Sequence, residues 1–154
     1  MIKEVRHIGI VVNNMENSLK FYQDLLGLKI IKDMDEQGGY INNMLSLDGV
    51  QVRTVKLSAG MGNTLIELLD FKSHSDNEIR NFYTIGASHV ALTVDNLEDL
   101  YKHLSENNIK FNAPPQKSPD GIVKVTFCDD PGGTPIELVE IINSTVAKIN
   151  DKNE

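Results

Sequence analysis

Two histidines and two glutamates recur at matching places of this chain. His7 stands in "VRHIGIVV" and His89 in "SHVALTV", while Glu67 and Glu137 stand in "TLIELLDF" and "TPIELVEI". Neutral imidazole and carboxylate are ligands that Zn, Ni, Co, Mn and Fe(II) accept in proteins. A lone histidine in a strand is more often structural, and a lone glutamate more often lies at the surface. Because both types occur twice in register, they favour a site for one divalent metal ion.

The other ionisable residues lack this recurrence. His74 and His103 have no counterpart in the other half of the chain. Asp70, Asp129 and Glu140 are interpreted as turn or solvent-facing residues. The candidate ligands are therefore limited to the four residues that repeat.

Composition excludes several classes of function. The chain has 154 residues, of which 40% are hydrophobic, and a formal net charge of −7, which fits one globular domain that binds neither nucleic acid nor an anionic membrane. Cys128 is the only cysteine, so internal disulfides and thiolate zinc clusters are excluded, and it is interpreted as a small residue of a buried strand. The sequence shows no signal-peptide pattern and no apolar run of membrane-spanning length, so we expect a cytoplasmic protein.

The elements that must position these residues form a repeat. In the first half, residues 5–12 predict a strand and residues 15–26 a helix that Asn14 caps. Residues 28–31 predict a second strand, and residues 33–49 a polar loop with a short helix near 41–45. Two further strands, 50–58 and 64–71, form a hairpin around a glycine-rich turn.

The second half restarts the same pattern. Residues 88–94 predict a strand, residues 97–108 a helix capped by Asn96, and residues 109–111 a short strand. Strands 122–129 and 134–142 follow. The sequence therefore predicts an α+β fold, with two tandem β-α-β-β-β modules that form a curved, barrel-like mixed sheet with helices outside.

The repeat also sets the domain boundaries. Module 1 spans about residues 1–71 and module 2 about residues 87–142 of a single domain, 1–142, and residues 143–154 form a polar C-terminal tail. Because alternate strand residues share a face, His7 lies beside Gly9 and His89 beside Ala91, small residues that leave room. The apolar residues between them should pack under the helices.

With these elements in place, the chain resembles the vicinal oxygen chelate superfamily. The matching stretches are "HIGIVVNNMENSLKFYQDLLGLK", "TLIELLDF", "SHVALTVDN" and "DDPGGTPIELVE". The superfamily includes lactoylglutathione lyase (glyoxalase I), methylmalonyl-CoA epimerase, fosfomycin-resistance proteins and extradiol dioxygenases. The resemblance implies a metal site on the inside of a sheet, with ligand positions that match His7, Glu67, His89 and Glu137.

The number of ligands helps to separate the branches of this superfamily. Glyoxalase I and the epimerases resemble this chain in having four protein ligands, whereas the dioxygenases and fosfomycin transferases use positions matching His7, His89 and Glu137 only. The presence of Glu67 favours the four-ligand branch. The resemblance thus implies a divalent-metal-dependent lyase or isomerase that moves a proton next to a carbonyl through an enediolate or enolate, with Glu137 as the first choice of base and Glu67 as the second.

Two differences between this chain and the members of the superfamily affect which substrate we expect. Val11 stands where bacterial glyoxalase I has an arginine that helps to hold glutathione, so the use of glutathione stays open. The second acid/base of the epimerase has two candidates here, Glu36 and Asp48. We expect a small-molecule substrate, such as a thioester, a hemithioacetal or another compound with vicinal oxygens.

The alternatives are an iron(II)-dependent extradiol-type dioxygenase, or a superfamily member of undefined specificity that binds a small molecule without catalysis. Superfamily members often form homodimers, with the metal site within one chain or across two chains. We expect a homodimer, and the sequence leaves both arrangements of the site open.

Overall fold

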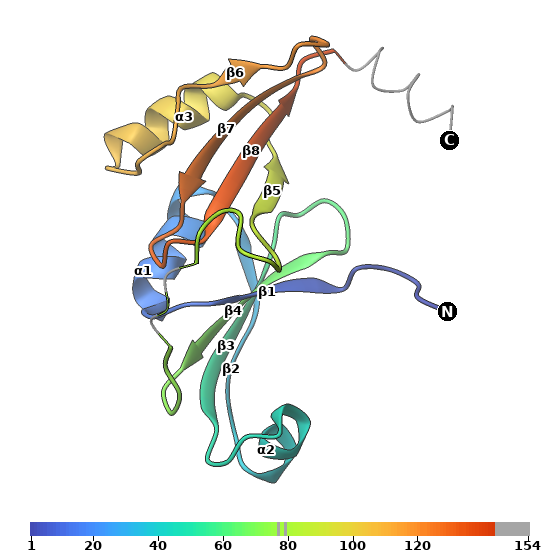
Figure 1. Cartoon of the computed structure of the whole chain (residues 1–154), viewed down its shortest axis with the longest axis vertical. Coiled ribbons are helices and arrows are strands. Elements are labelled where there is room, and N and C mark those ends of the chain that lie inside the picture. The colour runs from blue at the N-terminus through green and yellow to red at the C-terminus, as the bar shows by residue number, and fades with distance from the viewer. Residues whose placement is uncertain (77, 79, 144–154) are drawn as a thin grey trace. The chain divides into compact units, whose positions relative to one another are not determined.

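The chain divides into two compact units, Met1–Arg80 and Asn81–Glu154 (Figure 1). The structure, a computed structural model, describes residues 1–76, 78 and 80–143. Nearly all of the predicted polar tail lies outside the described residues. Each unit holds its own sheet and its own helix after the first strand.

Unit 1 contains a mixed sheet with the strand order β1-β4-β3-β2. Its elements are β1 (His7–Val11), α1 (Met15–Leu19), η1 (Lys20–Leu25), β2 (Lys29–Gln37), α2 (Gly39–Leu45), β3 (Gln51–Ser58) and β4 (Leu65–Phe71). β1 runs parallel to β4, and the other pairs are antiparallel. In Figure 1, α2 lies at the end of unit 1 where β2 leads into β3.

Unit 2 repeats this topology with the order β5-β8-β7-β6. Its elements are β5 (Val90–Thr93), α3 (Leu97–Glu106), β6 (Gln116–Lys117), β7 (Val123–Asp129) and β8 (Pro135–Ile141). β5 again runs parallel to β8, while β7 is antiparallel to both of its neighbours. The predicted α+β fold of two β-α-β-β-β modules is confirmed, with the strands divided between two four-stranded mixed sheets.

Both helices that follow a first strand begin at the predicted asparagine. The side chain of Asn14 accepts a hydrogen bond from the amide of Asn17, and that of Asn96 accepts one from the amide of Asp99. An asparagine at this place satisfies one of the backbone amides that a helix start leaves without a partner. No helix in the described ranges is long and apolar enough to cross a membrane.

The first helix widens after α1. In η1 the amide of Leu26 donates to the carbonyl of Phe21, 3.0 Å away, which is a span of five residues. A turn of this kind holds one residue more than a regular turn. The neighbouring residues Phe21 and Tyr22 are both buried, with ring centroids 5.0 Å apart. The wide turn thus contains two consecutive aromatic residues of the core.

The apolar side of each first strand packs as the alternation predicts. Ile10 and Val12 of unit 1 and Val90 of unit 2 are buried, although Ile8 is 37% exposed. The last strands add Leu68 in unit 1 and Leu138 in unit 2, both with no exposed side-chain surface. The candidate metal ligands lie on the opposite side of each sheet.

Two predictions of local structure are wrong. β2 continues to Gln37, through residues predicted as a loop, because an edge strand with exposed polar side chains lacks the apolar alternation that reveals a strand. The predicted strand 109–111 forms only an isolated bridge between Phe111 and Cys128, and the short β6 lies further on, at Gln116–Lys117. Cys128 itself is buried, as expected.

Candidate metal centre

The first histidine and the first glutamate meet inside unit 1. His7 is the first residue of β1, and Glu67 lies in the middle of the neighbouring strand β4. His7 Nε2 and Glu67 Oε2 are 3.0 Å apart, with the side chains 34% and 13% exposed. An imidazole nitrogen and a carboxylate oxygen are therefore adjacent and accessible, as two ligands of one ion would be.

The second pair repeats this geometry inside unit 2. His89 immediately precedes β5, and Glu137 lies in β8. His89 Nε2 and Glu137 Oε2 are 3.1 Å apart, with the side chains 32% and 22% exposed. Ser88 Oγ lies 2.7 Å from the other ring nitrogen, Nδ1, and a hydrogen bond there directs Nε2 toward the carboxylate.

The strand register explains why both pairs form. Glu67 is opposite Gly9 across the parallel pair, and Glu137 is opposite Ala91. A Cβ atom built on Gly9 would come within 3.3 Å of Leu69 Cδ1, so the smallest residue fits best beside Glu67. The histidine two residues before each small residue shares its face and can lean over it toward the carboxylate.

The surroundings of the two pairs differ. Across the antiparallel pair, Glu67 faces Lys56 of β3, whereas Glu137 faces Phe127 of β7. Lys56 Nζ lies 3.2 Å from Glu67 Oε1, so both oxygens of this carboxylate have a partner. No second partner of the Glu137 carboxylate is found among the described residues.

Aromatic rings surround His89 instead. The ring of Phe82 stacks on the imidazole with centroids 5.6 Å apart, and Phe127 meets it edge-on at 5.3 Å. The two phenylalanines also contact each other at 5.4 Å. The pair of unit 2 thus lies against an apolar wall, while the pair of unit 1 lies beside a cation.

Asp70 and Glu140 correct one of our interpretations. Asp70 is 3% exposed and accepts a hydrogen bond from the amide of Met15, at the start of α1. Glu140 accepts one from the amide of Leu97, at the start of α3, at 2.9 Å. They are not solvent-facing residues, because each satisfies a helix amide. The repeated spacing of three residues after Glu67 and after Glu137 was the signal, since odd spacing in a strand points to the opposite face.

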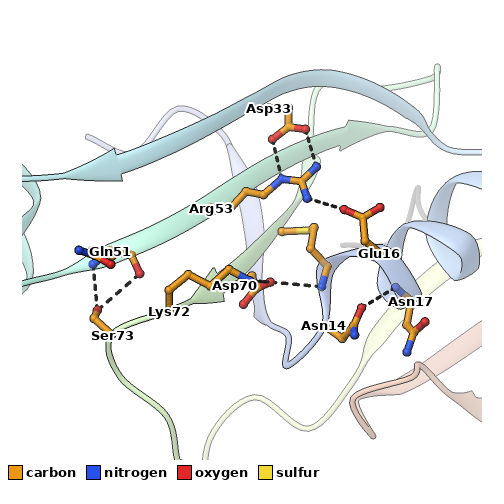
Figure 2. A network of polar contacts seen from close by, with 10 residues as sticks. Asn14, Glu16, Asn17, Asp33, Gln51, Arg53, Asp70, Lys72 and Ser73 are labelled. Atoms are coloured by element: carbon orange, nitrogen blue, oxygen red, sulfur yellow. Dashed lines mark hydrogen bonds and ion pairs between the residues drawn. The ribbon is translucent and has the colours of Figure 1, made fainter.

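A cluster of charges lies on this helix side of unit 1 (Figure 2). Arg53 donates through Nε and Nη2 to the two oxygens of Asp33, at 3.0 and 2.8 Å, and through Nη1 to Glu16 at 2.6 Å. The hydrogen bonds of Arg53 hold the pKa of Asp33 below its usual value of 3.8. Lys72 is paired with Asp70.

Two shallow hollows of about 190 and 260 Å³ adjoin this cluster. Both are lined by Arg53 and Lys72, and neither is lined by His7 or Glu67. Because Asp33, Glu16 and Asp70 already pair with Arg53 and Lys72, these hollows offer an anionic ligand no unpaired cation among their lining residues. Asp35 and Glu36 add negative charge to the hollow of about 260 Å³.

The structure separates the two candidates for a second acid or base. Glu36 lies in β2 opposite Val52, and its Oε2 accepts a hydrogen bond from Thr54 Oγ1 at 2.7 Å. Thr54 and Lys56 share a face of β3, so Glu36 lies on the same side of the sheet as Glu67. Asp48 is exposed in the turn before β3. Only Glu36 is on the side that carries the His7–Glu67 pair.

The donor set suits a divalent ion. Within each unit the described residues bring together one imidazole and one carboxylate, and no group of three or more candidate ligands is found among residues 1–76, 78 and 80–143. A site with four protein ligands requires the pairs of both modules, from one chain or from two. The nitrogen and oxygen donors, without thiolate, fit the ions predicted from the sequence.

The repeat, the sheets and the paired donors agree with the comparison to known families. The sequence model of the Glyoxalase/Bleomycin resistance protein/Dioxygenase superfamily matches residues 4–138. The chain belongs to this superfamily, and the resemblance seen in the sequence is confirmed.

The relatives do not share one activity, and the solved structure reported below supports the fold. The uncharacterized protein YwkD of Bacillus subtilis (strain 168) is 30% identical over 142 residues, which are 91% of this chain and 98% of YwkD. The lactoylglutathione lyase of Neisseria meningitidis serogroup B (strain MC58) is 27% identical over 136 residues, 87% of this chain and 88% of the lyase. A crystal structure of a glyoxalase family protein from Bacillus cereus matches with a TM-score of 0.81 and 18% identity, covering 92% of this chain and 97% of that chain.

Proposed function

We propose that this protein is a divalent-metal-dependent lyase or isomerase that moves a proton next to a carbonyl group. The observation that carries the proposal is the recurrence of one His–Glu pair at the same register in both modules. Similarity to a lactoylglutathione lyase over most of the chain supports this class of reaction. The substrate would be a thioester, a hemithioacetal or another compound with vicinal oxygens.

In this proposal His7, Glu67, His89 and Glu137 hold the ion. The ion would polarise the substrate carbonyl and stabilise the negative charge that forms as the α-proton leaves. Glu137 takes and returns that proton, because its Oε1 has no partner among the described residues, whereas Lys56 and His7 engage both oxygens of Glu67. Glu36 is the candidate for a second acid or base.

Metal content tests the ligand set. His89→Ala should lose bound metal by at least about tenfold in affinity, because an imidazole donor is removed, and should lose turnover. His103→Ala is the matched control, since His103 is exposed in α3 and pairs with no candidate ligand. The measurement is elemental analysis of the purified full-length protein, followed by exchange of substrate α-hydrogen with deuterated water. Metal content that is unchanged in His89→Ala would contradict the assignment.

The contact between Lys56 and Glu67 favours one alternative, a three-ligand centre of His7, His89 and Glu137. Such a set resembles that of the dioxygenase and transferase branches. Under this alternative Glu67→Gln keeps its metal while Glu137→Gln loses it. Under the four-ligand proposal both variants bind metal more weakly than the wild-type protein does.

We further propose a homodimer in the cytoplasm. A dimer would allow the two pairs to meet across chains, and the single cysteine fits the reducing cytoplasm. Sedimentation at several protein concentrations tests the assembly.

A further inference from the structure

The face of unit 1 that carries His7 and Glu67 also carries two lysines. Lys56 of β3 and Lys32 of β2 are directly opposite each other in the antiparallel pair. Directly opposite residues share a face of the sheet, with Cβ atoms about 5 Å apart. Since Lys56 touches Glu67, both lysines lie on the side of the candidate metal ligands.

In the cross-strand row formed by Gly9, Glu67, Lys56 and Lys32, two lysines stand against one carboxylate. Glu67 has one carboxylate for Lys56, and Lys32 is exposed and forms no ion pair with any residue in the described part of the chain. Glu36 lies four residues along β2, about 13 Å away at the usual rise per residue, and its carboxylate is engaged by Thr54. Like charges opposite each other in a sheet are destabilising, so an anion between them would relieve repulsion.

A metal ion would increase this excess of positive charge. Once Glu67 donates to a divalent ion, its negative charge no longer balances Lys56 alone. The position equivalent to Lys56 in unit 2 is Phe127, so the cation is a property of one module and not of the fold.

We propose that Lys56, assisted by Lys32, binds an anionic oxygen group of the substrate beside Glu67. This inference rests on the proposed function and narrows its substrate class to compounds in which the vicinal oxygens carry, or adjoin, a carboxylate or another anion. Lys56 is a specificity-determining residue: it selects charged substrates over neutral ones of the same shape. Its ammonium group donates hydrogen bonds to the anion, which are stronger than those to a neutral oxygen.

Binding of oxalate, a small dianion with neighbouring oxygens, tests the proposal without knowledge of the substrate. Calorimetric titration of the full-length protein, both metal-loaded and metal-free, should show that Lys56→Met lowers oxalate affinity by about tenfold or more. Lys32→Met should lower it less, and Lys56→Arg should retain most of it. The loss should be smaller for oxamate, which has the same shape and one charge fewer.

Lys117 provides a matched control. Lys117 and Lys124 are also opposite each other, in β6 and β7, but Lys124 pairs with Glu98 of α3, so this lysine pair lies on the helix side of its sheet. Lys117→Met changes the net charge by the same amount and should leave oxalate affinity unchanged. Equal weakening by Lys117→Met and Lys56→Met would show a general charge effect and overturn the proposal, as would wild-type affinity in Lys56→Met.

The metal content of each protein separates this inference from the proposed function. A wild-type protein that holds no metal contradicts the proposed function, whereas oxalate binding that depends on Lys56 in the metal-free protein still supports the anion site. A protein that holds metal, but whose oxalate affinity is the same with and without Lys56, supports the proposed function and contradicts the anion site. Unfolding curves for each variant confirm that the proteins compared are folded.

Discussion

At the scale of single residues, position within the repeat predicts more than residue type does. Glu67 and Glu137 have the same neighbours in the sequence, and the structure places each beside a histidine. The sequence could not predict Lys56 and Phe127 as their other neighbours, because these come from a third strand whose register depends on the length of a turn. The candidate ligands were therefore predictable, and the difference between the two surroundings was not.

Arg53 provides a test of residue-scale electrostatics. Arg53→Met removes the bidentate contact with Asp33, and we expect a loss of about 1 kcal/mol in unfolding free energy at neutral pH. The contact lowers the pKa of Asp33, so its stabilisation is present above the usual carboxyl pKa of 3.8 and is lost as the pH falls through the lower folded-state value. The difference between wild type and Arg53→Met should thus shrink in acid.

Urea unfolding at several pH values measures this difference. Lys102→Met is the control, because Lys102 Nζ and Glu106 Oε1 are 4.0 Å apart with side chains 77% and 64% exposed, and such a pair contributes little. A loss at neutral pH that persists undiminished in acid would show that Arg53 stabilises the protein through packing instead.

At the scale of elements, the last strand of each module carries side chains with different roles on its two faces. One carboxylate of β4 or β8 faces the candidate metal, and another, three residues later, holds the first amide of a helix. In the sequence, the alternation of apolar and polar residues predicted most strands of the two sheets. It missed β2 beyond its first residues, because a polar edge strand is held by backbone pairing and charge contacts rather than by burial.

Substitution of Glu140 tests the role of this carboxylate at the start of α3. Glu140→Ala should reduce the unfolding free energy by about 1 kcal/mol, because the amide of Leu97 loses its acceptor and the helix start loses a favourable negative charge. Glu106→Ala, at the exposed end of α3, should have a much smaller effect. Thermal unfolding measures both, and equal stability of the two variants would contradict this role for Glu140.

At the scale of the whole molecule, each of the two units carries one pair of candidate ligands. This division gives a test of whether the site lies within one chain or across two. The double variants His7→Ala/Glu67→Gln and His89→Ala/Glu137→Gln should each lose metal when purified alone, since each lacks one pair. If the site forms across a dimer, mixing and refolding the two variants restores one intact site in each mixed dimer.

Metal content of the mixture, measured after removal of free ions, is the readout. No recovery in a mixture that sediments as mixed dimers assigns the site to a single chain. Metal retained by either double variant alone would contradict the four-ligand set. The sequence predicted the two modules, and its candidate ligands stay a prediction. The choice between one chain and two depends on contacts between modules, for which a strand pattern gives no signal.

The wide turn at η1 bears on how the two modules can diverge. It gives the first helix one residue for which α3 has no counterpart, and it holds the buried aromatic pair Phe21 and Tyr22. Deleting a single residue between Lys20 and Leu25 would remove the extra residue of the wide turn and restore a regular helix. The first helix is therefore not interchangeable with its counterpart, and a chimera that exchanges them should lose core packing even though both helices begin in the same way.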